Sequence, residues 1–465
     1  MRRERDPLGE REVPAHALWG IQTLRAQENF PISGLRPHPA FVDAVVRIKR
    51  AAAIVHRGTG RLEAPLADAI IGAATAILDG AHRDQFVVDP FQAGAGTSHN
   101  MNVNEVLANL ANRALGAPLG AYAPVHPNDH VNMAQSTNDV IPTAIRLAAL
   151  AGLASFHDAA ARAVAALDAK ARDFDGIVKA GRTHLQDAMP IRLGQEFGAW
   201  AGSLARAEAR ITEASAPLHE LGIGGSAVGT GVNVEPAYPA AMVAELARDT
   251  GLALTMHPDR VQAMQSMGDV AAMHAMLRVF AVELSRIASD LRLIASGPRT
   301  GLDELRLPAV QPGSSIMPGK VNPSILEMVN QVCLQVMGHD HVVSAAAEHG
   351  QLELNVMMPV IAHDVLHSLS WLTNALTVLT DRCLVGITAN AAQNAYWVER
   401  STALVTALAP AIGYARAASL AKRAVEEDVA IRTLVVREGV LSAADADRIL
   451  DLARLTRLGV PGRDA

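Results

Sequence analysis

Aromatic residues are scarce in this sequence, and an excess of positive charge is absent. Only 3% of the 465 residues are Phe, Trp or Tyr, whereas half of the chain is hydrophobic and Ala is abundant. A composition this apolar excludes an intrinsically disordered chain, and small aliphatic residues favour closely packed helices over sheets. The formal net charge is −6 and the basic residues are scattered. Since nucleic-acid-binding proteins cluster their basic residues on one face, we expect a folded helical protein without a nucleic-acid partner.

Cysteines and long apolar runs are also few. The two cysteines, Cys333 and Cys383, lie far apart, without the spacing of a metal site or of a disulfide framework. The sequence MRRERDPLGE at the amino-terminus lacks the apolar core of a signal peptide. Apolar stretches such as residues 147–156 are shorter than the roughly 20 residues of a membrane span. We therefore expect a cytoplasmic protein that is neither secreted nor associated with a membrane.

Apolar residues recur every three or four positions in two long segments, which predicts amphipathic helices. The first helix should begin near Asp139 and contain the stripe Leu153, Phe156, Ala160, Val164, Leu167, Ala171 and Phe174. The second stripe extends from Val270 to Ile294. Residues 193–215, 323–347 and 356–384 are also expected to be helical. Five long helices indicate a bundle, and because their apolar stripes are broad, we infer that they also pack against other subunits.

The distribution of Pro, Gly and Ala predicts an all-α protein of three domains. The region before the first long helix is interrupted by Pro and Gly and should hold shorter helices, whereas the last part of the chain is rich in Ala. We place an amino-terminal helical domain at 1–138, a central long-helix domain at 139–393 and a small carboxy-terminal helical domain at 394–465.

The segment QPGSSIMPGKVNP, residues 311–323, carries the most informative polar side chains. Its prolines and glycines exclude a regular helix, so we expect a loop between two bundle helices. Lys320 and Asn322 there can bind a carboxylate, and backbone N–H groups beside the glycines can form an anion site near Ser314 and Ser315. An ordinary turn rich in Ser, Gly and Pro is the alternative.

Two further segments place polar residues at expected helix starts. Ser136, Thr137 and Asn138 come directly before the first long helix, where unpaired N–H groups attract anions. One of the three should cap the helix, which leaves two without a structural role. In GAGTSHNMNVNEVLAN, residues 94–109, Thr97 opens a helix that also carries Asn100 and Asn104 on one face. Aligned asparagines of this kind indicate a buried polar network.

Histidines and glycines give weaker signals elsewhere. GRTHLQDAMPIRLGQEF, residues 181–197, carries Thr183 and His184 ahead of another helix, and Glu327 is a candidate to orient that histidine. A lone histidine is more often structural. No histidine has metal-ligand spacing, so we expect no metal site. The glycine-rich residues 221–233 follow an expected helix and lack the lysine of a phosphate-binding loop, which argues against a nucleotide site.

With these segments in order, the chain resembles the aspartase/fumarase superfamily over nearly its whole length. The matching sequences are GEREVPAHALWGIQTLRAQENF, GTSHNMNVNEV, PNDHVNMAQSTND, GRTHLQD and GSSIMPGKVNP. GAGTS, QSTND and GQLELNVM are similar to the aspartase branch. The resemblance implies a three-domain all-α fold whose central helices assemble into a D2 homotetramer. It also implies active sites shared between subunits, a small dicarboxylate substrate and no cofactor.

The resemblance also implies a role for each polar residue in the elimination of ammonia from L-aspartate. Ser314 would be the general base. Ser315, Ser136, Thr137 and Thr97 would hold the carboxylate that becomes the aci form, and Thr183, Lys320 and Asn322 would hold the other carboxylate. Asn138 and His184 would lie beside the leaving amine, with Glu327 orienting His184. Such a site must stabilise the doubly negative intermediate more than the substrate.

Three departures from the family pattern leave the leaving group open. Met133, Met358 and His99 stand where other residues are usual in aspartases. The alternatives are the same elimination on another C4 dicarboxylate, with water lost from malate or nitrite lost from nitrosuccinate, and a non-catalytic structural tetramer. Asn138 and His184 do not discriminate between the leaving groups, because both can bind an amine, a hydroxyl or a nitro group.

Overall fold

The computed structural model of the protein describes residues 1–462 and is predominantly helical. Eight short strands occur within these residues, and they form four separate two-stranded sheets. This arrangement confirms the all-α class expected from the composition and the apolar periodicity.

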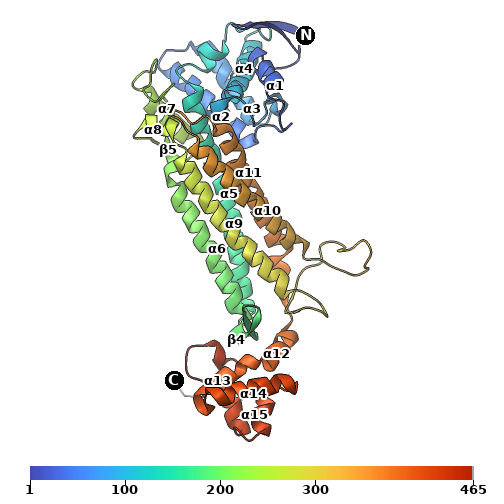
Figure 1. Cartoon of the computed structure of the whole chain (residues 1–465). Helices are drawn as coiled ribbons and strands as arrows, with labels where there is room; N and C mark the ends of the chain where they lie inside the picture. The colour runs from blue at the N-terminus through green and yellow to red at the C-terminus, as the bar shows by residue number, and fades with distance from the viewer. Residues whose placement is uncertain (463–465) are drawn as a thin grey trace. The chain divides into compact units, whose positions relative to one another are not determined.

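Five long helices dominate the chain (Figure 1). They are α5 (Thr137–Asp173), α6 (Leu193–Ser215), α9 (Gly268–Ile294), α10 (Ser324–Glu348) and α11 (Met358–Arg382). The bounds of α6 agree with the prediction, and the other four begin and end close to the predicted residues. The apolar stripe of α9, which includes Val270, Leu277 and Leu284, is fully buried. The three-to-four-residue spacing therefore identified the buried faces correctly.

Helix α5 carries a longer apolar segment than the sequence pattern indicated. By length and composition alone, this helix could cross a membrane. However, 72% of its most apolar 18-residue stretch is buried inside the structure, as in the core helix of a bundle. Packing between helices therefore accounts for the apolar character of α5.

The chain forms two compact units, each assembled from three separate stretches of sequence. Unit 1 comprises residues 1–158, 208–281 and 333–373, and unit 2 comprises residues 159–207, 282–332 and 374–465. Each of the five long helices contributes residues to both units. The division into three domains at residues 138 and 393 stays a prediction.

Unit 1 combines the first parts of the chain with segments of the long helices. Its bundle part is held by packed rings, such as Phe156 of α5 against Phe280 of α9, with centroids 5.0 Å apart. The buried Ser368 hydroxyl links His274 of α9 to His339 of α10. The other elements of this unit are β1 (Arg2–Asp6), β2 (Gly9–Val13), α1 (Ile21–Asn29), α2 (Pro39–Gly58), α3 (Ala64–Leu78), α4 (Thr97–Ala114), β5 (Glu220–Leu221), α7 (Tyr238–Thr250), β6 (Thr255–Met256) and α8 (Arg260–Gln265).

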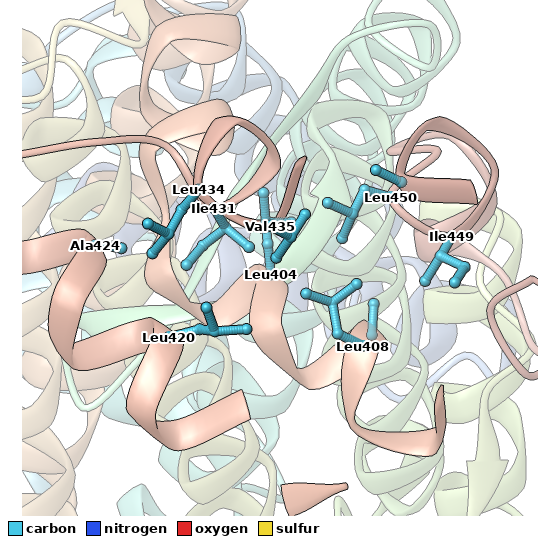
Figure 2. Close-up of a cluster of buried hydrophobic side chains, with 11 residues drawn as sticks. Leu404, Leu408, Leu420, Ala424, Ile431, Leu434, Val435, Ile449 and Leu450 are labelled. Carbon is cyan, nitrogen blue, oxygen red and sulfur yellow. The ribbon is translucent and has the colours of Figure 1, made fainter. Parts of the chain in front are cut away.

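Unit 2 contains a β-hairpin and the carboxy-terminal helices. Its elements outside the long helices are β3 (Val178–Thr183), β4 (Gln186–Arg192), β7 (Leu305–Arg306), β8 (Thr388–Ala389), α12 (Ala391–Arg400), α13 (Val405–Ile412), α14 (Tyr414–Glu426), α15 (Ile431–Arg437) and α16 (Ala443–Ile449). Figure 2 shows the apolar core of the last helices, where Leu408, Leu434 and Leu450 are fully buried. These helices therefore have a hydrophobic core of their own.

Candidate active site

The amino-terminus of α5 is closed by a reciprocal capping arrangement. The Ser136 hydroxyl accepts a hydrogen bond from the Asn138 N–H at 3.2 Å, and the Asp139 carboxylate accepts one from the Ser136 N–H at 2.9 Å. This pairing is a capping box with Asp in place of Glu. Ser136 is thus the capping residue that the sequence led us to expect among residues 136–138. The helix begins at Thr137, slightly before the predicted Asp139.

The glycine-rich residues 221–233 pack against this helix start. The N–H groups of Gly224 and Ser226 each donate to Asp139 Oδ2 at 3.0 Å, and Asn138 Nδ2 donates to the Ala227 carbonyl at 2.8 Å. The segment follows the short strand β5, not a helix as expected. Gly224 has a φ of +88°, and a Cβ there would meet Pro239 at 2.6 Å. Glycine is therefore required for the loop to reach Asp139.

Burial strongly shifts the pKa of the Asp139 carboxyl. Removal from water raises the pKa of its carboxyl to about 6, and the three backbone N–H donors oppose this rise. Asp139 was not singled out from the sequence, although the spacing Ser-x-x-Asp ahead of an apolar stripe is a recognisable capping signal. Its role is to join the glycine-rich loop to the helix that carries Ser136, Thr137 and Asn138.

Helix α4 supplies a buried polar network through Asn100, whereas Asn104, predicted to belong to the same network, bonds only to Met101 Sδ at 3.4 Å. Thr97 is the exposed first residue of the helix, and Asn100 is 1% exposed. Asn100 Nδ2 donates to Thr137 Oγ1 at 3.2 Å and to Asn132 Oδ1 at 3.3 Å. Unit 1 therefore contains a bonded connection between the start of α4 and the start of α5.

An open groove of about 420 Å³ lies beside Thr97. Its lining includes Gln22 and Arg25 of α1 together with Thr97 and Ser98. The Arg25 guanidinium is paired with the Asp6 carboxylate at 2.7 Å. These two α1 side chains lie inside a motif that carries the family resemblance, but the sequence alone gave no reason to select them.

Thr183 and His184 lie on a β-hairpin that was not predicted from the sequence. Strands β3 and β4 pair in antiparallel fashion, with Thr183 opposite Gln186. The two turn residues, His184 and Leu185, have φ values of +55° and +59°. These values match the two-residue turn that normally requires Asn or Gly. Non-glycine residues in this conformation store backbone strain, which is typical of functional sites, and Thr183, His184 and Leu185 are all exposed.

A buried group of charges fixes the base of this hairpin. Lys179 Nζ lies 2.8 Å from the Glu196 carboxylate and 3.0 Å from that of Glu304. Arg182 Nη2 lies 2.8 Å from the other oxygen of Glu304, whose side chain is fully buried. Removing either partner of such a network leaves a buried charge without compensation. The exposed tip with His184 is thus mounted on a rigid base.

The segment carrying Ser314 is a loop, as predicted. The Ser314 hydroxyl accepts hydrogen bonds from the N–H groups of Ile316 and Met317 at 3.2 and 2.9 Å. Asn322 Nδ2 donates to the Gly313 carbonyl at 2.6 Å, and the Gly313 N–H donates to the Lys320 carbonyl at 2.8 Å. These bonds close the loop upon itself. The side chains of Ser315 and Lys320 are exposed, whereas that of Ser314 is half-buried.

Glu327 does not contact His184 within one chain. It lies in the first turn of α10, where its carboxylate is 3.9 Å from the Arg292 guanidinium. Within residues 1–462, neither a hydrogen bond nor an ion pair joins Glu327 to His184, although both belong to unit 2. The expected pairing of these two side chains therefore stays a prediction.

The three residues that depart from the family pattern differ in exposure. His99 is fully buried and stacked on Phe41, and burial lowers the pKa of its imidazole to about 3. Met358 is also fully buried, at the start of α11. Met133 is half-buried, and its carbonyl bonds to the His56 ring. Because His99 and Met358 have no exposed surface, neither offers a polar group to a ligand in this chain.

The predicted site residues are distributed over both units. Thr97, Ser136, Thr137 and Asn138 belong to unit 1, whereas Thr183, His184, Ser314, Ser315, Lys320, Asn322 and Glu327 belong to unit 2. The side chains of residues 1–462 contain no group of three or more His, Cys, Asp or Glu that could hold a metal ion.

Comparisons with known proteins agree with this arrangement of helices and polar loops. A family model described as lyase matches residues 9–338, and one described as fumarase C C-terminus matches residues 404–457. Aspartate ammonia-lyase of Bacillus subtilis (strain 168) is 45% identical over 99% of this chain and 97% of its own. Class II fumarate hydratase of Halobacterium salinarum is 47% identical over 100% of this chain and 98% of its own.

A solved structure extends the comparison to the fold. The structure described as fumarate lyase:delta crystallin from Brucella melitensis bound to cobalt has a TM-score of 0.94 and is 48% identical. The superposition covers 98% of this chain and 100% of that chain. Long helices with polar loops at their ends, together with these matches, define an enzyme of the lyase class. The chain belongs to the aspartase/fumarase superfamily.

Proposed function

We propose that this lyase removes ammonia from L-aspartate to give fumarate, with Ser314 as the general base. The main support is the environment of the Ser314 hydroxyl, which accepts two backbone N–H groups within its loop. Hydrogen bonds to the charged form of a group favour that form. Two N–H donors aimed at Oγ would therefore stabilise the serine alkoxide that a base of this kind needs.

The proposed reaction has two steps, proton abstraction from C3 and then loss of ammonia from C2. Ser314 Oγ takes a proton from C3 of L-aspartate, and the electron pair moves into the neighbouring carboxylate to form the aci-carboxylate. When that pair returns to form the C2–C3 double bond, the C2–N bond breaks and the ammonium group leaves as ammonia. The proton held by Ser314 is then released, so that fumarate and ammonium are the products.

Two groups of residues would bind the two carboxylates. The carboxylate that becomes the aci form would lie at the start of α5, where hydroxyls and helix N–H groups favour negative charge. Its ligands would be Ser136, Thr137, Ser315 and Thr97. The second carboxylate would be held by Thr183, Lys320 and Asn322. Asn138 and His184 would lie beside the leaving amine, with Glu327 orienting the histidine.

Such a site is completed by assembly of the chain. We propose a homotetramer in which each active site combines segments of different subunits, as the superfamily resemblance implies. The proposed enzyme works without a cofactor, in the cytoplasm. Light scattering of the purified protein during gel filtration tests the tetramer, and a monomer with full activity would contradict shared sites.

Loss of water or nitrite from another C4 dicarboxylate is the second candidate function. It is supported by the Halobacterium salinarum relative, which is named a fumarate hydratase and is as similar to this chain as the aspartate ammonia-lyases. A non-catalytic tetramer is the remaining alternative, since the similar Brucella melitensis protein is described as a delta crystallin as well as a fumarate lyase. The presence of Ser314, Lys320, Asn322 and His184 together argues against it.

Fumarate formation tests these proposals directly. L-aspartate, L-malate and nitrosuccinate are supplied separately to the purified protein, and fumarate is followed by its ultraviolet absorbance. Turnover of L-aspartate with release of ammonia is the expected result. Turnover of L-malate or nitrosuccinate alone would show that the leaving group is water or nitrite instead of ammonia. Inactivity on all three compounds would favour the non-catalytic tetramer.

A further inference from the structure

Helix α2 carries a lysine that is completely removed from water. The side chain of Lys49 is 0% exposed, although lysine normally keeps its ammonium group in solvent. Its Nζ donates to Asn132 Oδ1 at 2.7 Å and to Gln135 Oε1 at 3.0 Å. Within the described part of the chain, no carboxylate lies within ion-pair distance of it. The proposed reaction assigns Lys49 no role.

The hydrogen bonds of Lys49 set the direction of the neighbouring amides. A lysine N–H can only donate, so Asn132 must present its amide oxygen to Lys49. Asn100 also contacts this oxygen and must therefore present its NH2 group. The same NH2 group donates to Thr137 Oγ1 at 3.2 Å. The order of donors thus extends from Lys49 through Asn132 and Asn100 to Thr137.

This order leaves the hydroxyl proton of Thr137 available for a ligand. Because Thr137 Oγ1 accepts from Asn100, its own proton can point away from that residue. Among residues 1–462, no acceptor for this proton is present. The side chain is half-buried at the first position of α5, where the helix N–H groups and dipole favour an anion.

The titratable groups around Lys49 agree with this order of hydrogen-bond donors. Burial lowers the pKa of Lys49 to about 7, and Asp139 on α5 opposes this shift. Even the neutral amine keeps two N–H groups for its two acceptors. The imidazoles of His99 on α4 and His56 on α2 have lowered pKa values because they are buried. The Asp139 carboxylate already accepts N–H groups of Ser136, Gly224 and Ser226.

We propose that Lys49 is a positioning residue that acts through Asn132 and Asn100 to direct the Thr137 hydroxyl proton toward a substrate carboxylate. The inference rests on the proposed function only in requiring a small dicarboxylate as the ligand. Lys49 itself does not touch the substrate. Its effect on binding is therefore transmitted entirely by the Thr137 hydroxyl.

A double-mutant cycle on the full-length protein tests this route. The affinity for succinate, an unreactive C4 dicarboxylate, is measured by titration calorimetry for the wild type, Lys49→Met, Thr137→Val and the double variant. Each single substitution should weaken binding about 10-fold, as expected for the loss of one hydrogen bond to a charged group. The double variant should also be weakened about 10-fold, because both changes remove the same interaction.

Two results overturn the proposal. Unchanged succinate affinity of Lys49→Met would show that the lysine does not influence the site. A double variant weakened about 100-fold, the product of the single effects, would show that Lys49 and Thr137 act independently. Circular dichroism and the oligomer size are measured for every variant, so that loss of folding is recognised.

Two asparagines on α4 provide a matched pair that does not depend on replacing the lysine. Asn104 is as buried as Asn100, but its side chain bonds only to Met101 Sδ, at 3.4 Å. Asn100→Leu should weaken succinate binding about 10-fold, whereas Asn104→Leu should leave it unchanged. Equal effects of the two substitutions would overturn the proposal even if Lys49→Met fails to fold.

The same measurements separate this inference from the proposed function. A wild type that binds succinate but releases no fumarate from L-aspartate contradicts the ammonia-lyase proposal alone. An active enzyme in which Lys49→Met binds succinate normally contradicts the role of Lys49 alone. Absence of succinate binding by the wild type would overturn both.

Discussion

The amino-terminus of α5 and the Ser314 loop carry most of the proposed substrate contacts, yet they are built in opposite ways. Around α5, the supporting residues Lys49, Asn100 and Asp139 are all buried and hydrogen-bonded. In the loop, the side chains of Ile316 and Met317 are 83% and 48% exposed. The loop is held mainly by hydrogen bonds among its own residues.

This difference indicates a division of labour between the two segments. A buried, hydrogen-bonded framework fixes donor directions before the ligand arrives, which lowers the cost of ordering on binding. An exposed segment with few buried apolar contacts has low local stability. We therefore expect the start of α5 to provide preorganised binding, and the loop to provide the reactive group.

Replacing the base gives the largest expected effect and tests the catalytic half of this division. Ser314→Ala should lower kcat by about 10²-fold or more, the scale of a lost acid–base group. Succinate binding should be retained, because Ser314 is assigned to the chemical step. Fumarate absorbance and titration calorimetry measure the two quantities. Near-normal turnover would remove Ser314 as the base.

Replacing the loop lysine asks whether the loop also contributes to binding. Lys320→Met should raise KM about 10- to 100-fold, as expected when a carboxylate loses a charged hydrogen-bond partner. Lys422→Met is the matched control, because Lys422 is an exposed lysine of α14 and should leave KM unchanged. An unchanged KM for Lys320→Met would show that Lys320 does not meet a carboxylate.

The pH dependence of stability tests whether the Asp139 carboxyl is buried at the start of α5. Its pKa rises from 3.8 to about 6 on folding. The raised pKa of Asp139 therefore contributes on the order of 3 kcal/mol to the free energy of unfolding below pH 4. This contribution is lost as the pH rises to about 6. Asp139→Asn should abolish this contribution. The difference in Tm between wild type and variant should change between pH 4 and 6, and a constant difference would contradict the buried carboxyl.

Replacing Ser136 gives the smallest expected effect and distinguishes its role as a helix cap from its role in ligand binding. Ser136→Ala should destabilise the protein by about 1 kcal/mol through loss of the cap, whereas Ser136→Gly should cost only a few tenths. Both variants lack the hydroxyl and should raise KM equally. Thermal unfolding and steady-state kinetics measure the two effects. A KM change that follows the stability loss would mean that Ser136 is only a cap.

The helices and their polar starts could be predicted because their signals are local. The apolar spacing located α5 and α9, and Ser136 could be placed at a helix start from capping chemistry alone. Thr97 also opens a helix, α4, but the cap residue there is Gly96, without a side-chain capping bond. The hairpin with Thr183 could not be predicted in this way. Its turn residues, His184 and Leu185, are neither Asn nor Gly, so the usual hairpin signal is absent.

The supporting residues of the site were missed because their roles depend on distant contacts. Lys49 lies in the middle of α2, where a lysine is ordinarily exposed, and its partner Asn132 lies 83 residues away. Glu304 is similar, since only the tertiary structure brings it to Lys179 and Arg182. A single sequence identifies residues with a recognisable motif, but not those that orient them.

The interleaved construction of the two compact units has a consequence for synthesis of the chain. Unit 1 includes residues 333–373, so it cannot be completed until most of the chain has been made. Unit 2 still requires residues 374–465, and at ribosomal rates these take roughly 5–20 s to produce. During that interval, parts of the long helices that belong to unit 2 lack their final partners. The nascent chain must therefore keep apolar helix surfaces from aggregating until translation is almost finished.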